Sequence, residues 1–345
     1  MLRFVLLTGV SQFRQVSVFS GLNNINDITF NPDYATICGI SEQELHDTFD
    51  WRVKEFADML GVEKERIYQE LRKRYDGFRF TQAETHVYNP FSLIRCLANK
   101  LFENYWFDSG VSSVVATVLP NYWYDFRKLN GPIKAHSSHL KRFVPEEVDP
   151  VPILFQTGYL TVDGYDPWEN TYTLRFPNEE VKWAFWHGAM PEALGKGNAT
   201  SYRQELDAMV EHLRAGRVDE LMDSLEFLLS TVPYSMVYHN QPTREAQFQL
   251  AVFFVFKLAG RDVRAEIPSA RGRSDIEVHT EDTVYIFELK VKGAKKGRKA
   301  TPEEAIAQIK ARGYDAPYWG SGKRVVLIGM AFNGRTKRFT WEVEG

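Results

Sequence analysis

The chain has 345 residues, of which 44% are hydrophobic and 25% are charged, and its formal net charge is −3. These proportions are ordinary for a folded protein and exclude a disordered or low-complexity chain. Its two cysteines exclude a disulfide framework, and no apolar run is long enough to span a bilayer. We therefore expect a cytoplasmic protein with more than one domain.

Taken in chain order, the first two-thirds of the sequence predicts mostly helices. Residues 2–8 form an apolar strand within a first region, 1–40, and amphipathic helical patterns dominate a second region, 41–131. A polar linker follows Gly131, and a helix end with a hairpin then predicts a winged-helix-like region over 132–198. Residues 199–235 are expected to form a helical linker of two helices joined at Gly216.

The last region, 236–345, predicts the order helix, three strands, helix, strand. Its first helix covers Arg244–Leu258 and ends at Ala259-Gly260, and a strand from Val263 to Ile267 is closed by Pro268. After a hairpin, Thr301-Pro-Glu-Glu304 begins a helix that stops at Gly313, and Arg324–Phe332 has the composition of a buried strand.

The hairpin between Arg273 and Lys290 carries three polar side chains on one face. Both of its strands alternate apolar and polar residues, and a turn centred on Glu281-Asp282 puts Asp275 directly across from Glu288. Directly opposed Cβ atoms of an antiparallel pair lie about 5 Å apart. Lys290 lies two residues after Glu288 and therefore shares its face.

Two carboxylates at this separation repel each other unless a cation lies between them, and hard oxygen ligands suit Mg²⁺. A lysine beside them can orient a water or stabilise negative charge that develops on a phosphate. Asp275, Glu288 and Lys290 thus predict a metal-dependent phosphodiesterase site. Because of the repulsion, we expect the metal-free protein to become more stable when either acid is replaced by alanine.

A similar triplet, Glu180-Val-Lys182, follows Asp166 at nearly the same spacing. Asn178 is a suitable N-cap and an apolar helical stripe follows it, so the triplet is expected on a helix rather than on a strand. There its ends diverge, and we interpret Glu180 and Lys182 as solvated surface residues.

The C-terminal motifs resemble the PD-(D/E)XK nuclease superfamily, and in particular the nuclease domain of a bacterial family with an AAA-ATPase-like region ahead of it. The matching segments are Arg244-Glu245, Gly272-Arg-Ser-Asp275, Tyr285-Ile-Phe-Glu-Leu-Lys290, Glu304-Ala-Ile-Ala-Gln-Ile309, Gly313-Tyr314 and Leu327-Ile-Gly329. Ser274 stands where the superfamily's name has proline, a position at which its members often vary.

This resemblance implies a restriction-endonuclease-like α-β-β-β-α-β domain that hydrolyses phosphodiester bonds, with DNA as the expected substrate. It implies that Asp275 and Glu288 hold Mg²⁺ or Mn²⁺, with the Leu289 carbonyl as a further ligand. It assigns Lys290 as the catalytic lysine and sets Glu245 and Gln308 beside the site.

Segments of the N-terminal half resemble the later, ATPase-like half of the same family. They include Leu7–Asp27, Tyr75–Phe80, Tyr88–Ser92, Phe102–Phe107 and Gln156–Thr161. Residues 1–40 would then be a remnant of the nucleotide domain, where Thr8 or Ser11 follows a late strand, and residues 41–131 would be its helical lid. No Gly-x-x-x-x-Gly-Lys-[Ser/Thr] loop occurs in the chain, so we expect no ATP binding.

Charge is distributed unevenly along the chain. Residues 236–345 hold 19 Lys and Arg against 13 Asp and Glu, whereas the remainder is acidic. Such a basic domain suits a polyanionic partner. The densest run follows Glu288 and could be either a solvated turn or a nucleic-acid contact made by Lys292, Lys295, Lys296, Arg298 and Lys299.

Three hypotheses stay open from the sequence. The first is an active divalent-metal nuclease, which the presence of Asp275, Glu288 and Lys290 favours. The second is a non-catalytic nucleic-acid-binding or regulatory module that keeps the fold. The third is half of a split NTPase–nuclease machine whose partner chain supplies the phosphate-binding loop.

Overall fold

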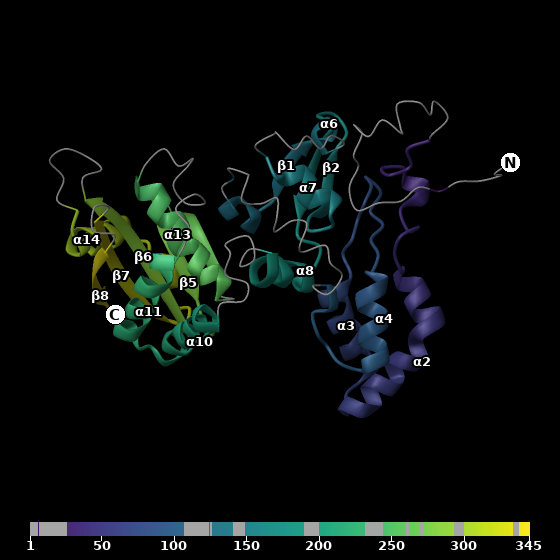
Figure 1. The fold of residues 1–345 in the computed structure, drawn as a ribbon, viewed down its shortest axis with the longest axis horizontal. Helices are drawn as coiled ribbons and strands as arrows, with labels where there is room; N and C mark the ends of the chain where they lie inside the picture. Colours follow the sequence, from purple (N-terminus) through teal and green to yellow (C-terminus); the bar gives the residue numbers. More distant parts are fainter. Residues whose placement is uncertain are drawn as a thin grey trace. The chain divides into compact units, whose positions relative to one another are not determined.

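The computed structural model describes residue 6 and residues 26–106, 124, 126–140, 149–189, 200–231, 244–259, 262–269, 272–292, 300–333 and 338–345. It divides the chain into two compact units, which we describe separately (Figure 1). Unit 1 comprises residues 1–124 and 131–189, and unit 2 comprises residues 125–130 and 190–345. Within the described ranges, no helix is both long enough and apolar enough to cross a membrane.

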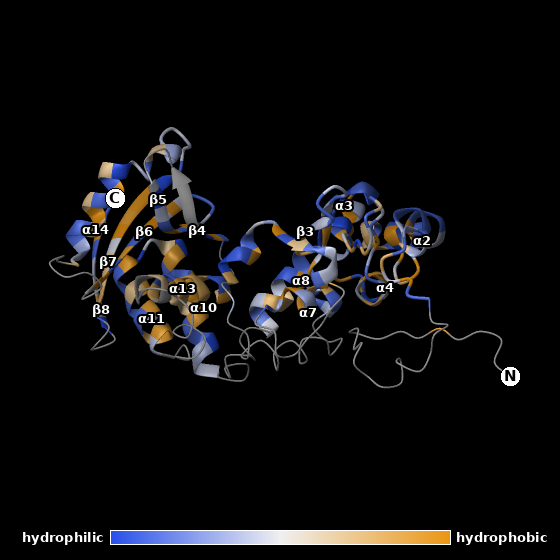
Figure 2. Ribbon diagram, turned by 90° about the horizontal axis from the view of Figure 1, so that it is seen from above, coloured by the Kyte–Doolittle hydropathy of each residue, from blue (hydrophilic) through white to orange (hydrophobic). Residues whose placement is uncertain are grey.

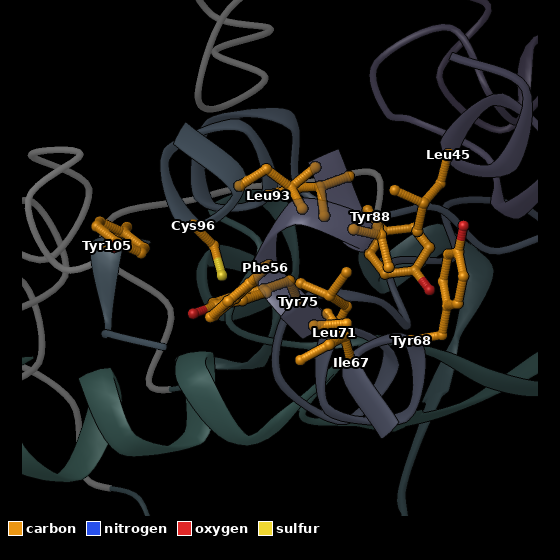
Figure 3. Close-up of a cluster of buried hydrophobic side chains, with 13 residues drawn as sticks. Leu45, Phe56, Ile67, Tyr68, Leu71, Tyr75, Tyr88, Leu93, Cys96 and Tyr105 are labelled. Carbon is orange, nitrogen blue, oxygen red and sulfur yellow. The ribbon is translucent and has the colours of Figure 1, made fainter. Parts of the chain in front are cut away.

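Three helices form the first part of unit 1: α2 (Glu42–Leu60), α3 (Lys64–Tyr75) and α4 (Pro90–Asn99). Their ends follow local sequence signals, because a reciprocal capping box between Ser41 and Glu44 begins α2 and the side chain of Asn89 caps α4. Apolar side chains from the three helices, including Phe56, Leu71 and Leu93, pack into one buried cluster (Figure 3). A short 3-10 turn, Pro32–Tyr34, precedes them.

The second part of unit 1 is a small antiparallel sheet with short helices around it. The strands β1 (Ile133–His136), β2 (Thr161–Asp166) and β3 (Thr171–Arg175) lie in the order β1-β3-β2. The helices are α6 (Ser137–Leu140), α7 (Val151–Gln156) and α8 (Glu179–Ala184), and a π-helical turn, Phe185–Ala189, follows α8. The hairpin expected within residues 132–198 is therefore present, while its assignment to a winged-helix module stays a prediction.

Glu180 corrects the sequence interpretation of the second acid-x-Lys triplet. The triplet does lie on helix α8, as expected, and Lys182 is exposed, but Glu180 is only 1% exposed. Its carboxylate accepts a 2.8 Å hydrogen bond from the backbone N–H of Trp106. The sequence misplaces it because Asn178 and Glu179 mark a solvated helix start, whereas the chain segment that covers Glu180 lies more than 70 positions earlier.

Unit 2 is built around a five-stranded mixed sheet in the order β4-β5-β6-β7-β8. The strands are β4 (Asp262–Ser269), β5 (Gly272–His279), β6 (Thr283–Lys292), β7 (Arg324–Asn333) and β8 (Arg338–Glu344). Only β6 and β7 are parallel. Strand β8 is absent from the sequence prediction, and Pro268 does not end β4 but pairs with Arg273 within it.

Helices cover both faces of this sheet (Figure 1). On one side, α14 (Pro302–Arg312) packs on β6 and β7 through an apolar cluster that includes Ile286, Ile306 and Leu327. On the other side lie α13 (Arg244–Leu258) and the pair α10 (Thr200–Ala215) and α11 (Val218–Thr231), which meet at Gly216 as predicted. A 3-10 turn, Ala316–Tyr318, follows α14.

Between Leu250 and Phe256, helix α13 is apolar around its whole circumference. Every residue from Leu250 to Phe256 is buried, and the helix is coloured as largely hydrophobic in Figure 2. It contacts β4, β5 and β6 on one side and α11 on the other. A helix that is apolar all round is normally covered on every side.

The expected nucleotide-domain remnant lies mostly outside the described residues, and Thr8 and Ser11 lie outside them as well. The region therefore stays a prediction. The mixed α/β arrangement of unit 2 agrees with the restriction-endonuclease-like order expected for the C-terminal region, with β8 as an addition.

Candidate active site

The hairpin of β5 and β6 has the predicted register and brings its two acids to neighbouring positions. The paired residues run from His279 and Val284 to Ile276 and Phe287, so the turn is centred on residues 281 and 282. In that register the next position sets Asp275 opposite Glu288. The backbone N–H of Leu289 donates a 2.7 Å hydrogen bond to Oδ2 of Asp275. The Asp275 carboxylate thus lies against the backbone of β6 beside Glu288.

Glu288 is held by two side chains that the sequence assigned to the same site. The Nζ atom of Lys290 lies 2.6 Å from Oε1 of Glu288, and the Nε2 atom of Gln308 on α14 donates to the same oxygen. Glu288 is 1% exposed and Lys290 is 8% exposed. This is a buried ion pair with an amide donor, so the structure brings Glu288, Lys290 and Gln308 together.

A glycine explains how α14 comes close enough to deliver Gln308. Gly329 on β7 is the parallel-strand partner of Glu288. A Cβ atom at Gly329 would lie 2.2 Å from the backbone oxygen of Pro302, at the start of α14. The hydroxyl of Thr301 caps this helix by accepting from the N–H of Glu304 at 3.3 Å. The start of α14 is thereby fixed directly over the Glu288 position.

A further carboxylate, Glu277, lies two residues after Asp275 on β5 and is engaged by other groups. Its side chain accepts hydrogen bonds from the hydroxyls of Ser274 and Tyr318, and the His279 ring lies 3.4 Å away. Burial favours the neutral acid, but the nearby His279 ring and the hydrogen bonds from Tyr318 and Ser274 outweigh it and lower the pKa of Glu277. We interpret this cluster as a structural support of β5.

Asp275 has a partner on α13 that the sequence reasoning missed. The Nε2 atom of Gln249 donates a 2.7 Å hydrogen bond to Oδ1 of Asp275, and the Oε1 atom of Gln249 accepts a 3.4 Å hydrogen bond from Arg127. Gln249 lies one helical turn after Glu245, so the i, i+4 spacing from the predicted Glu245 could have revealed it. The side chain of Glu245 itself lies outside the described residues. No local signal points to Arg127.

The basic run that was expected to contact nucleic acid lies almost wholly outside the described residues. Lys292 is the last residue of β6, but its side chain lies outside the described part of the chain. The same holds for the whole of Lys295, Lys296, Arg298 and Lys299.

The donor set around the hairpin fits a hard divalent cation. Asp275 and Glu288 offer carboxylate oxygens, and Mg²⁺ is commonly held by one or two protein carboxylates together with substrate phosphates. Across the described residues, no three His, Cys, Asp or Glu side chains gather in a group suited to a metal ion. The fit therefore rests on the two acids, with the Leu289 carbonyl as the predicted third oxygen.

Comparison with known proteins agrees with this location. A protein of Azotobacter chroococcum mcd 1, described as an uncharacterized protein in the vnfD 5' region, is 29% identical over 338 residues, which is 96% of this chain. The chain spans 61% of that relative's length. No solved structure matches the chain significantly. Residues 243–342, which contain α13, the hairpin and α14, match the family model of the PD-(D/E)XK nuclease superfamily, and this match supports a nuclease domain at these positions.

Proposed function

We propose that the chain is a divalent-metal-dependent nuclease that hydrolyses phosphodiester bonds in DNA. The observation that carries the proposal is the convergence at one end of the β5–β6 hairpin: Asp275 lies against the backbone of Leu289, while Lys290 and Gln308 both bind Glu288. The match of residues 243–342 to the nuclease superfamily supports the same reaction class.

Asp275 and Glu288 are the residues that would hold Mg²⁺ or Mn²⁺, together with the Leu289 carbonyl. Bound there, the ion supplies positive charge that polarises a phosphate and makes a water molecule more acidic. Lys290 is a cation paired with Glu288, so its Nζ atom can orient the attacking water or stabilise charge on the phosphate. Gln308 holds the Oε1 atom of Glu288, which restrains the direction of that carboxylate.

DNA is the proposed substrate because the C-terminal region is basic while the rest of the chain is acidic. Lys292, Lys295, Lys296, Arg298 and Lys299 follow the proposed site directly and are proposed to contact phosphates. Phosphate contacts read charge rather than base edges, so this loop is expected to capture DNA without sequence preference.

The test compares wild type with Asp275→Asn and Glu288→Gln, two nearly isosteric changes that remove one negative charge each. Cleavage of labelled duplex DNA, single-stranded DNA and RNA is followed with Mg²⁺ and with excess EDTA. Glu281→Gln removes the same charge from the exposed turn of the same hairpin and is the matched control.

We expect wild type and Glu281→Gln to cleave DNA in a metal-dependent way and both site variants to lose cleavage while remaining folded. Binding without cleavage by wild type would instead identify a non-catalytic nucleic-acid-binding module. Cleavage that survives in both site variants would show that the reaction occurs elsewhere. Faster cleavage of RNA than of DNA would overturn the proposal that DNA is the substrate.

A further inference from the structure

A short turn from the first half of the chain is part of unit 2. The 3-10 turn Phe126–Asn130, which we call the docked turn, belongs by its contacts to the unit that contains the hairpin. Phe126 and Leu129 are buried, and the Phe126 ring lies 5.8 Å from the Phe254 ring of α13. The Nδ2 atom of Asn130 donates to the backbone oxygen of Val263 at 3.2 Å. The docked turn therefore packs on α13 and on β4.

The docked turn also reaches the candidate site through one side-chain relay. Arg127 donates from its guanidinium to Oε1 of Gln249 at 3.4 Å, and Gln249 donates from Nε2 to Oδ1 of Asp275 at 2.7 Å. A guanidinium only donates and a carboxylate only accepts. Gln249 satisfies both partners in one orientation of its amide, with oxygen toward Arg127 and nitrogen toward Asp275. Arg127 thus reinforces the amide orientation that Asp275 requires, because it binds the oxygen end of Gln249.

Gln249 and the backbone of β6 hold the two oxygens of Asp275 separately. Oδ1 accepts from Gln249, and Oδ2 accepts from the N–H of Leu289. Two donors on different oxygens restrain the rotation of the carboxylate as well as its position. Gln249 is 9% exposed, so water competes poorly for this contact.

We infer that Gln249 and Arg127 are positioning residues for Asp275, and that the docked turn is a working part of the nuclease unit. The inference deepens the proposed function, on which its metal-binding arm rests. Partners that orient a metal ligand commonly change metal affinity or activity by about 10- to 100-fold when they are removed. Arg127 lies 122 positions before Gln249 and outside the residues that match the nuclease family model.

The experiment uses the full chain with Gln249→Met, Arg127→Ala and the double variant. Gln249→Met keeps the approximate length of the side chain and removes its donor. Lys128→Ala removes the same charge from a neighbouring exposed position of the docked turn and is the matched control. Asn130→Ala removes a docking contact to the backbone of Val263, which is not part of the Arg127–Gln249–Asp275 relay.

Two readouts are measured. The first is the affinity for Mn²⁺, by calorimetry without DNA. The second is hydrogen exchange of the Leu289 amide, by NMR without metal, because this N–H is donated to Asp275 and reports how firmly that carboxylate is held.

We expect Gln249→Met to weaken Mn²⁺ binding by about 10- to 100-fold and to speed exchange at Leu289. Arg127→Ala should weaken binding by about 2- to 10-fold, in line with one lost hydrogen bond. The double variant should match Gln249→Met, because in the inferred relay Arg127 acts on Asp275 through Gln249. Lys128→Ala should resemble wild type in both readouts, and Asn130→Ala should lower stability without changing Mn²⁺ affinity.

The outcomes separate this inference from the proposed function. If wild type binds Mn²⁺ through Asp275 and Glu288 but neither Gln249→Met nor Arg127→Ala changes affinity or Leu289 exchange, the inference is wrong and the nuclease proposal stands. If wild type neither binds Mn²⁺ nor cleaves, but Leu289 exchange still depends on Gln249 and Arg127, the positioning stands and the nuclease proposal is overturned. If the losses of Mn²⁺ affinity add up in the double variant, Arg127 does not act through Gln249.

Discussion

Replacing Glu180 with glutamine removes a buried negative charge from α8 while keeping the shape of the side chain. Burial raises the pKa of Glu180 to about 7 from its ordinary value of 4.5, and the hydrogen bond from the N–H of Trp106 offsets only part of this effect. Between pH 4.5 and about pH 7, the folded protein keeps a proton on Glu180 that the unfolded chain has released. The stability of unit 1 should therefore fall as pH rises through this window.

The size of the effect follows from the two pKa values. Below pH 4.5 the carboxyl is protonated in both states and costs nothing, and above pH 7 the cost is constant. The difference of about 2.5 pH units corresponds to about 3 kcal/mol, at about 1.4 kcal/mol for each unit. The amide oxygen of Glu180→Gln can still accept from Trp106. The variant should therefore be more stable than wild type by about 3 kcal/mol near pH 8.

The measurement is urea unfolding of wild type and Glu180→Gln at several pH values between about 5 and 8. The stability difference should be small near pH 5 and should grow until about pH 7. Glu179→Gln is the control, because it removes the same charge from an exposed neighbour that pairs with Lys73, and it should change stability by less than about 1 kcal/mol. Parallel pH profiles for wild type and Glu180→Gln would refute the reasoning.

Three further predictions concern unit 2. Gly329→Ala sets a Cβ atom against the Pro302 oxygen and pushes α14, with Gln308, away from Glu288. It should therefore lower stability by about 1–3 kcal/mol in thermal unfolding and weaken Mn²⁺ binding in calorimetry. The control Gly131→Ala, at a glycine in open space, should change neither. Glu288→Ala leaves the buried Lys290 without its carboxylate and should destabilise the metal-free protein by about 3–5 kcal/mol. Replacing both Glu288 and Lys290 with methionine should change stability little. Equal losses of stability in the single and the double variant would contradict this prediction. The third variant replaces four cations of the basic run with glutamine: Lys295, Lys296, Arg298 and Lys299. In anisotropy titrations with Ca²⁺, the slope of log affinity against log salt should become shallower by about two to four units. An unchanged slope would show that DNA binds elsewhere.

The sequence predicted those parts of unit 2 that depend on local patterns. Alternation fixed the hairpin register, and an N-cap with a proline at the first turn fixed the start of α14. The partners of the two acids were harder to foresee. The sequence suggested that Asp275 and Glu288 repel each other in the metal-free protein, whereas the structure gives each its own donors. These donors lead us to predict the opposite effect of Glu288→Ala on stability.

Long-range contacts account for the features that the sequence missed. Glu180 looks solvated in its own helix and becomes buried only because residues near Trp106 cover it. Arg127 lies in a segment that has no feature of a nuclease domain, and its role depends on docking against α13. Strand β8 lies at the edge of the sheet with many exposed residues, so its composition resembles that of a loop.

The apolar middle of α13 shows that the region matching the nuclease family model does not form a self-sufficient folding unit. Residues 243–342 carry the hairpin and both flanking helices, but they omit α10, α11 and the docked turn. A fragment cut at those limits would expose the side of α13 that Phe126 and α11 cover, with Phe254 in the open surface. Recombination that transfers this domain to another protein therefore has to carry its covering segments with it, even though one of them is encoded far upstream.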